Sequence, residues 1–191
     1  MPMKTDKHKI YYNWEDMESQ VHHITKQMYA DNWRPDYVVG LTRGGLTPAV
    51  LLSHWLGCPM YALHVRLLDG NEEDCEHNTW MAEDALGAVN HNTDPTNEAR
   101  WDPKYRKNIL IVDDINDSGA TINWIKQNWP SGCFPDGPWD RIWGHNVRFA
   151  TLVNNTGSDA EVDYASVDID KLEHPDTWIV FPWEDWEQDH G

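Results

Sequence analysis

Residues 109–121 read Ile-Leu-Ile-Val-Asp-Asp-Ile-Asn-Asp-Ser-Gly-Ala-Thr, and this stretch decides the fold. The four branched aliphatic residues 109–112 are typical of a strand that is buried on both faces, as in a parallel sheet. Asp113 and Asp114 follow where we expect that strand to end, and a helix is expected to start near Thr121. The stretch therefore predicts a strand, a short turn and a helix, the repeating unit of an α/β fold.

The turn in this unit has the features of an anion-binding site. Free backbone N–H groups at a helix N-terminus point outward, and the helix dipole favours negative charge. Gly119 allows the backbone to turn tightly and to approach a phosphate. Asp113 and Asp114 would repel a phosphate, so we expect them to hold sugar hydroxyls or a Mg²⁺ ion. Phosphoribosyl pyrophosphate has the 5′-phosphate, the diol and the metal-bound pyrophosphate that meet these requirements.

A second strand, turn and helix is predicted from residue 37 onward. The apolar run 37–41 leads into Thr42-Arg43-Gly44-Gly45, and a helix is expected to follow. Two such turns at the carboxyl ends of parallel strands flank one crevice, where α/β sheets bind ligands. A guanidinium between glycines can hold pyrophosphate in bidentate fashion, which gives Arg43 a function. The alternative is that Arg43 is a surface residue beside a plain turn.

These motifs resemble those of the type I phosphoribosyltransferases, in which two acidic residues precede a D-[ST]-G-x-T loop. Residues 39–46 are similar to the pyrophosphate loop of the bacterial xanthine–guanine branch of that family. Residues 13–14 and the following helix resemble the start of those enzymes. Near the C-terminus, residues 176–179 and 182–184 resemble their purine-binding hood. The resemblance covers most of the chain.

The resemblance implies an α/β fold with a central, mostly parallel sheet flanked by helices, in a single domain over residues 1–191. A small C-terminal hood is expected at about 171–191. The polar stretch 69–103 is expected to be a flexible flap that closes over the reacting centre. Arg66, just before it, is a further candidate contact for pyrophosphate. The tryptophan-rich loop 129–143 is a candidate subunit interface, because aromatic residues are enriched at such surfaces.

The resemblance also implies roles for individual residues. Asp113 and Asp114 would hold the ribose diol and Mg²⁺, with Asp114 as the expected metal contact. Asp117 would accept a proton from the purine near N7, which makes it the candidate catalytic residue. Trp178 would stack on the base, with core packing as the alternative, and Ile179 would offer backbone groups to the base edge. The candidate contacts for phosphoribosyl pyrophosphate are Thr42, Arg43, Gly44, Asp113, Asp114, Asp117, Ser118, Gly119, Ala120 and Thr121.

The sequence departs from the family pattern at two positions. The family has a lysine that reads the 6-oxo group of the purine, and our alignment places Asn155 there. Because an amide both donates and accepts hydrogen bonds, the choice between a 6-oxo and a 6-amino purine stays open. Ala120 stands where glycine is common, and we expect its methyl group to be tolerated.

The implied reaction transfers the phosphoribosyl group to guanine, xanthine or hypoxanthine and releases pyrophosphate, as in purine salvage. Its transition state resembles an oxocarbenium ion, and charge builds on the leaving pyrophosphate. Mg²⁺ and Arg43 would stabilise that charge while Asp117 takes a proton from the base. Two alternatives stay open: the same chemistry on adenine or an unusual base, and a non-catalytic protein that binds phosphoribosyl pyrophosphate or a nucleotide and regulates a partner.

The composition limits the possible partners. The 191 residues include 32 Asp and Glu against 15 Lys and Arg, which gives a net charge of −17. Such a chain repels nucleic acid and anionic membranes, so neither is expected as a partner. The absence of a long apolar run or a signal peptide and the three scattered cysteines predict a cytoplasmic protein. Related enzymes are oligomers, so a homodimer or homotetramer is expected.

Overall fold

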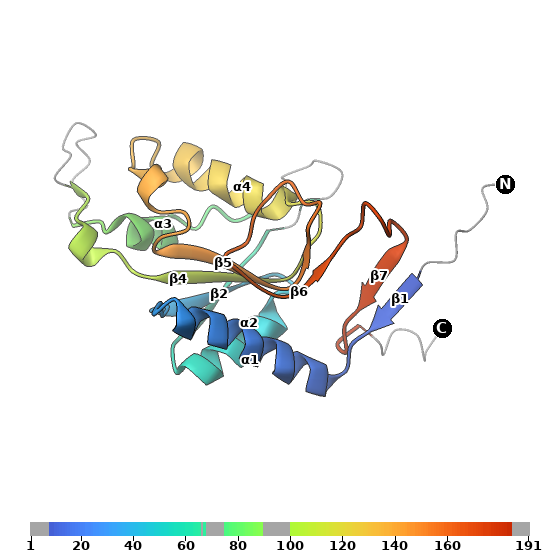
Figure 1. The fold of residues 1–191 in the computed structure, drawn as a ribbon. Helices are drawn as coiled ribbons and strands as arrows, with labels where there is room; N and C mark the ends of the chain where they lie inside the picture. The colour runs from blue at the N-terminus through green and yellow to red at the C-terminus, as the bar shows by residue number, and fades with distance from the viewer. Residues whose placement is uncertain (1–7, 66, 68–74, 90–99, 185–191) are drawn as a thin grey trace.

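In the computed structural model, a five-stranded sheet forms the centre of the molecule (Figure 1). The structure describes residues 8–65, 67, 75–89 and 100–184. The strands lie in the order β3-β2-β4-β5-β6, and all neighbouring pairs are parallel. They are β2 (Tyr37–Leu41), β3 (Met60–Leu63), β4 (Ile109–Asn116), β5 (Val147–Asn155) and β6 (Tyr164–Ile169). The predicted α/β fold with a mostly parallel sheet is confirmed.

Helices cover both faces of this sheet (Figure 1). On one face lie α1 (Trp14–Ala30) and α2 (Leu46–Leu56). On the other lie α3 (Thr79–Leu86) and α4 (Ala120–Asn128). Short helical turns occur at Pro103–Tyr105, Trp129–Cys133 and Trp139–Arg141. None of the helices among the described residues is long and apolar enough to cross a membrane.

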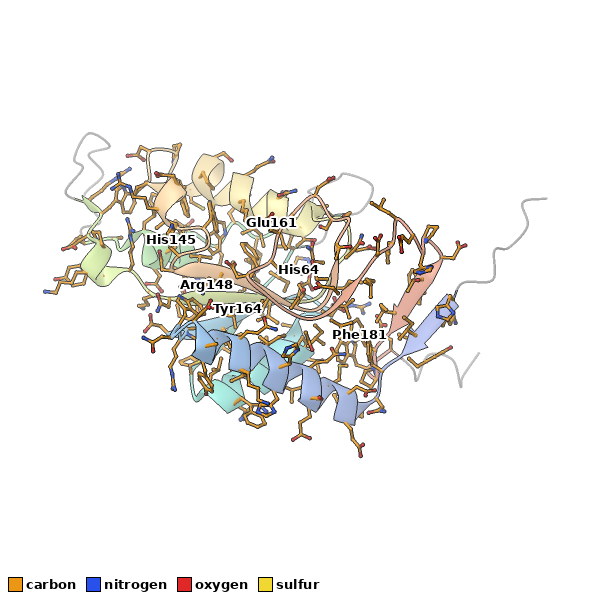
Figure 2. The ribbon with its side chains drawn as sticks, viewed as in Figure 1. His64, His145, Arg148, Glu161, Tyr164 and Phe181 are labelled. Atoms are coloured by element: carbon orange, nitrogen blue, oxygen red, sulfur yellow. The ribbon has the colours of Figure 1, made fainter. Side chains whose placement is uncertain are left out.

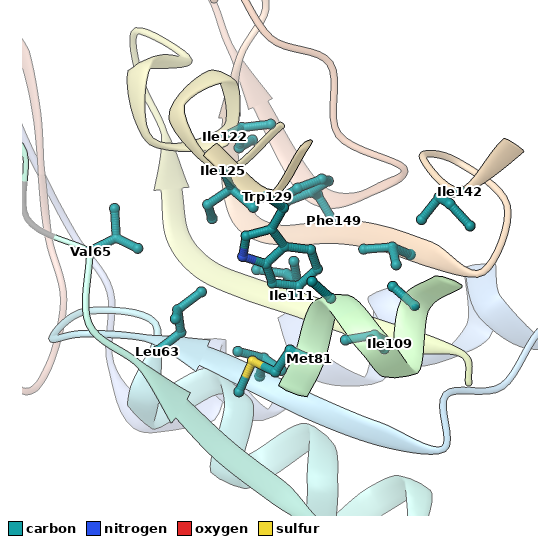
Figure 3. Packing of buried hydrophobic residues seen from close by; sticks show 14 of the residues in the cluster. Leu63, Val65, Met81, Ile109, Ile111, Ile122, Ile125, Trp129, Ile142 and Phe149 are labelled. Atoms are coloured by element: carbon teal, nitrogen blue, oxygen red, sulfur yellow. The ribbon is translucent and has the colours of Figure 1, made fainter. Parts of the chain in front are cut away.

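The four aliphatic residues at the start of β4 supply both halves of the core. Ile109 and Ile111 pack in the cluster under α3 and α4, which Figure 3 shows from close by. Leu110 and Val112 point the other way, into the cluster under α1 and α2. Successive side chains of a strand alternate between its faces, so a strand covered by helices on both sides needs apolar residues at every position.

Helix α1 begins with a capping box at Asn13. The side chain of Asn13 accepts a hydrogen bond from the backbone N–H of Asp16, and the Asp16 carboxylate accepts one from the N–H of Asn13. This reciprocal arrangement satisfies two backbone donors that the helix leaves without partners. The apolar stripe of this helix is buried from Met17 to Met28, but Trp14 at its start is 56% exposed and contacts the ring of Trp183.

The structure adds a helix that the sequence did not lead us to expect. Helix α3 lies within the stretch 69–103, and its buried residues are Met81, Ala82, Ala85 and Leu86. Arg66 and the ranges 69–74 and 90–99 lie outside the described residues. Part of this stretch therefore belongs to the core, and closure of a flap over the site stays a prediction.

The tryptophan-rich loop 129–143 packs inward. Trp129, which is labelled in Figure 3, is fully buried. Trp139 is 7% exposed, and the rings of both residues form one cluster with Trp143. These side chains pack in the core of their own chain, so they give no support to a subunit contact at this loop, which stays a prediction.

Two further strands form a small separate sheet. β1 (His8–Tyr11) and β7 (Thr177–Val180) run parallel to each other. Figure 1 shows them side by side at the end of the molecule where the chain leaves β6. The side chains of Phe181 and Ile179 join this small sheet to the cluster under α1 and α2. It occupies the position of the expected hood, of which residues 185–191 lie outside the described residues.

Candidate active site

The loops after β2 and β4 meet at the carboxyl ends of these neighbouring strands. A Cβ atom on Gly44 would lie 2.0 Å from Oδ2 of Asp114, and one on Gly45 would lie 2.3 Å from the carbonyl oxygen of Val112. Only glycine fits at such distances, so these two residues let one loop lie directly against the other. Between them and β2, the Thr42–Arg43 peptide bond is cis, and the Arg43 side chain is exposed.

Asp113 and Asp114 form a half-buried acidic pair on β4, which continues to Asn116 rather than ending before them. Oδ1 of Asp113 accepts from the N–H of Asp114 at 3.0 Å, and Oδ1 of Asp114 accepts from the N–H of Ile115 at 2.8 Å. Burial raises the pKa of Asp113 well above its usual range, with a further contribution from the Asp114 charge. Burial also raises the pKa of Asp114, to about 6. No lysine or arginine among the described residues forms an ion pair with either carboxylate.

This pair fits a Mg²⁺ ion that is completed by its substrate. The described residues contain no cluster of three or more metal-ligating side chains. Mg²⁺ is commonly held by only one or two carboxylates together with substrate phosphates and water. Two desolvated carboxylates without a cationic partner provide that number of protein ligands.

The loop after β4 encloses a hollow of about 90 Å³ at the start of α4. Gly119 has φ 84°, a conformation that favours glycine, and a Cβ atom there would lie 2.5 Å from the backbone nitrogen of Ala160. The Oγ of Ser118 accepts from the N–H of Ala120 at 3.3 Å. The hollow is lined by Asp113, Ile115, Asn116, Asp117, Ser118, Gly119, Ala120, Thr121 and Ile122. With the backbone N–H groups of the helix N-terminus, it offers a cradle for one phosphate.

Asp117 has an ionic partner that sequence reasoning missed. The Nζ of Lys171, in the connection between β6 and β7, lies 2.8 Å from Oδ2 of Asp117. The Lys171 side chain is 20% exposed and that of Asp117 is 51% exposed. The two residues are 54 positions apart. A lone lysine in an acidic connection is the only hint of this pair that the sequence contains.

Asn155 lies beside this pair, but its side chain forms hydrogen bonds within the protein. Its amide donates to the backbone carbonyl of Asp117 at 2.8 Å. Its Oδ1 accepts from the backbone N–H groups of Gly157 and Lys171 at 3.2 and 3.1 Å. Three of the four hydrogen bonds that an asparagine side chain can make are therefore used internally. Asn155 fixes the backbones of both members of the ion pair.

A second residue that we did not predict supports the loop after β2. The hydroxyl of Thr42 and Nδ1 of His64, the residue directly after β3, form a hydrogen bond of 2.7 Å. Figure 2 labels His64. The backbone of His64 is itself held by Glu76 through two hydrogen bonds. His64 thus ties the third strand to the loop that contains Arg43.

The small sheet supplies an aromatic surface. Trp178 on β7 is 49% exposed, whereas the neighbouring Ile179 is 7% exposed. The Phe181 ring stacks on Trp183 with their centroids 4.7 Å apart. An exposed indole can stack on a planar base, and Ile179 presents only backbone groups because its side chain is buried.

Taken together, these groups can bind an anion in the hollow, place two carboxylates beside an arginine-bearing loop, and accept a proton at an exposed aspartate. The exposed aromatic ring on the small sheet adds a place for a flat, partly apolar group. This combination suits a sugar that carries a phosphate and a second anionic group, bound beside a planar base. No other part of the described structure gathers this set.

Comparisons with known proteins agree with this description. Residues 8–185 match the family model described as phosphoribosyl transferase domain. A xanthine-guanine phosphoribosyltransferase of Cereibacter sphaeroides is 28% identical over 152 residues, which cover 80% of this chain and 70% of that protein. A hypoxanthine-guanine phosphoribosyltransferase of Schizosaccharomyces pombe is 22% identical, over 92% of this chain and 89% of that protein.

Solved structures share the fold. A purine phosphoribosyltransferase from Pyrococcus horikoshii aligns with a TM-score of 0.60 at 23% identity, over 92% of this chain and 94% of that chain. A xanthine-guanine-hypoxanthine phosphoribosyltransferase from Helicobacter pylori aligns with a TM-score of 0.61 at 18% identity, over 95% of this chain and 97% of that chain.

Proposed function

This chain belongs to the phosphoribosyl transferase domain family, and from that membership we propose that it transfers the phosphoribosyl group of phosphoribosyl pyrophosphate to a 6-oxopurine. The products are a nucleotide and pyrophosphate, and purine salvage is the role that the reaction serves. Guanine, xanthine and hypoxanthine are the proposed acceptors, in keeping with the relatives, which are named for the same bases.

The observation that carries this proposal is the meeting of two loops at one edge of the sheet. Gly44 lies against the Asp114 carboxylate, and the hollow at Ser118 and Gly119 adjoins Asp113 on the same strand. A pyrophosphate at the first loop and a 5′-phosphate in the hollow would leave the ribose between them, against the acidic pair. That order of groups is the order in phosphoribosyl pyrophosphate itself.

The chain's own residues support each part of the reaction. Arg43 neutralises charge that builds on the leaving pyrophosphate, and the N-terminus of α4 holds the 5′-phosphate in place. Asp117 accepts the proton that the base loses as its nitrogen bonds to C1 of the ribose. Asp114 and Asp113 would hold Mg²⁺, which when bound supplies further charge neutralisation.

Lys171 supports a 6-oxopurine as the acceptor. An ammonium group has three donors and no acceptor, so beside Asp117 it can donate to an oxo group but not receive a bond from an amino group. Asp117 and Lys171 together present one acceptor and several donors. The N7–H and the 6-oxo group of a purine present the complementary pair. We propose that Lys171, rather than Asn155, makes this distinction.

We also propose that the protein is cytoplasmic and that it assembles into a homodimer or homotetramer. The three cysteines are free, which is usual for a protein of the reducing cytoplasm. Assembly into a homodimer or homotetramer follows from the family resemblance alone.

Pyrophosphate release tests the proposal. The purified chain is supplied with phosphoribosyl pyrophosphate and Mg²⁺, and guanine, hypoxanthine, xanthine and adenine are offered in parallel. We expect turnover of 6-oxopurines, and its loss in Asp117→Asn. Turnover of adenine alone would support the phosphoribosyl transfer but contradict a 6-oxopurine as the acceptor. Tight binding of phosphoribosyl pyrophosphate with no turnover of any base would contradict the proposed enzymatic activity and favour a non-catalytic regulator.

A further inference from the structure

A groove of about 560 Å³ lies at the opposite end of the sheet from the candidate active site. Most of its lining comes from the segments that lead into β4 and β5, with Trp33 ahead of β2 and Arg148 on β5, so it lies at the amino ends of these strands. Figure 2 shows two of its residues, His145 and Arg148, at the end of the molecule far from Phe181. The lining residues are Trp33, Pro103, Arg106, Asn108, Arg141, His145, Asn146 and Arg148.

The charge of this lining is opposite to that of the chain. Three of the seven arginines in the sequence line the groove, whereas no aspartate or glutamate does. The whole chain has a net charge of −17. Grouped guanidinium groups repel one another, so an anion bound among them is favoured.

Arg148 forms a fixed wall of the groove. Its guanidinium pairs with Asp31 at 2.8 Å, contacts the hydroxyl of Tyr164, and lies 4.9 Å from the centre of the Trp33 ring. Its Nε donates to the backbone carbonyl of His145 at 3.2 Å. Because Arg148 already has a carboxylate partner, it shapes the groove rather than supplying the free charge.

Arg106 and Arg141 supply that charge. The Nε of Arg106 is buried and has no hydrogen-bond partner, and Nη1 reaches the backbone carbonyl of Arg141 at a long 3.4 Å. Burial, and next the neighbouring Arg141, lower the pKa of Arg106. The Asp140 carboxylate lies 3.9 Å from Nε of Arg141, and both side chains are at least 75% exposed, so this pair is weak. A buried N–H without an acceptor costs stability unless a ligand completes it.

We propose that this groove is a second anion site, which binds a phosphate-bearing small molecule through Arg106 and Arg141. A phosphate has enough oxygens to accept from two guanidinium groups at once, which a single carboxylate does less well. The volume suits a ligand of mononucleotide size. Nucleic acid is a poor fit, since the rest of the chain would repel it. The site is separate from the proposed function and stands whether or not the chain is a transferase.

The NMR signal of the Arg106 Nε–H group reports on binding at this site. In a ¹⁵N-labelled sample of the full chain, the seven arginines give few side-chain signals, and Arg106→Gln identifies one by its loss. Inorganic phosphate, pyrophosphate and GMP are titrated separately. We expect the Arg106 signal to shift saturably, and Arg141→Gln to weaken binding at least tenfold. Arg34→Gln, which removes an exposed arginine outside the groove, should leave the affinity unchanged.

Two further measurements distinguish this site from the candidate active site and identify its ligand. The shift of the Arg106 signal should persist in Arg43→Gln, which alters the loop after β2. Equal binding of inorganic phosphate and GMP would assign the site to the phosphate alone, and tighter binding of GMP would assign it to a nucleotide. The proposal is overturned if no probe moves the Arg106 signal at millimolar concentration, if Arg34→Gln weakens binding as much as Arg141→Gln, or if succinate binds more tightly than phosphate.

Discussion

The ammonium nitrogen of Lys171 lies 2.8 Å from a carboxylate oxygen of Asp117, so the proposed proton acceptor is one half of an ion pair. This contact joins the loop after β4 to the connection between β6 and β7. A base that bonds to Asp117 must therefore lie within reach of the lysine as well. In the proposed complex, Asp117 accepts the proton from N7 of the purine, and Lys171 donates to the 6-oxo group beside it.

Lys171→Met should reduce the selectivity for hypoxanthine over adenine more than it reduces binding of phosphoribosyl pyrophosphate. The variant keeps the length of the side chain but loses the donors to the 6-oxo group. A hydrogen bond to a charged group contributes about 1.5–3 kcal/mol, so we expect kcat/KM for hypoxanthine to fall about 10- to 100-fold. The KM for phosphoribosyl pyrophosphate should change little.

Two variants make that result specific. Lys104→Met removes an exposed lysine from the short helical turn Pro103–Tyr105 and should have no effect on kcat/KM. Lys171→Arg keeps the donors and should recover part of the activity on hypoxanthine. Unchanged discrimination between hypoxanthine and adenine in Lys171→Met would exclude Lys171 as the residue that reads the base, without touching the assignment of Asp117.

The close fit of Gly44 against Asp114 predicts a coupled pair of substitutions. In Gly44→Ala the new methyl group would lie 2.0 Å from Oδ2, so loop and strand must separate. Overpacking of this kind costs about 1–3 kcal/mol of unfolding free energy, measurable by urea denaturation. Asp114→Ala removes the carboxylate that the methyl group meets, so the cost of Gly44→Ala should be smaller in that background. Additive effects would contradict the contact.

The acidic pair predicts how stability depends on pH. The pKa of Asp114 is raised to about 6 by burial, above the value of about 3.9 in an unfolded chain. The folded state therefore favours the protonated form. The contribution of Asp114 to the free energy of unfolding should be greatest below about pH 4 and should fall as the pH rises to about 6. The Asp114 contribution to that fall is at most about 3 kcal/mol.

Urea denaturation in the absence of Mg²⁺ and substrate, repeated between pH 4 and 7, measures this dependence. Asp114→Asn removes the titrating group, so it should flatten the profile and raise stability at pH 7. Asp140→Asn, at an exposed position in the turn that precedes β5, is the matched control and should leave the profile as it is. A wild-type profile that rises between pH 4 and 6, with no difference in Asp114→Asn, would refute the assignment.

Short-range patterns predicted the two loops well. Residues 37–45 and 109–121 each contain a complete strand, turn and helix start, so their structure depends mainly on their own side chains. The same holds for Asn13, whose capping partner is three residues away. Where a feature depends on contacts between distant segments, the sequence alone could not predict it.

Lys171 and helix α3 illustrate that limit. Lys171 meets Asp117 only because β4, β5 and β6 are neighbours in the sheet, which brings the ends of β4 and β6 to one edge. Helix α3 is short and carries charged residues, and its place in the core depends on the rings of the 129–143 loop. Those rings looked suited to a subunit contact because nothing local indicates what they cover.

The commitment of the Asn155 side chain predicts that a lysine introduced there will not act as a base reader. Asn155→Lys would remove hydrogen bonds to the backbones of Asp117, Gly157 and Lys171 and would place a charge at a position that is 8% exposed. Unsatisfied buried groups cost about 1–3 kcal/mol each, so we expect a loss of about 2–4 kcal/mol in unfolding free energy. Thr156→Lys, at the exposed neighbouring position, should cost less than about 0.5 kcal/mol. If Asn155→Lys instead folds with full stability and gains activity on 6-oxopurines, Asn155 rather than Lys171 occupies the base-reading position.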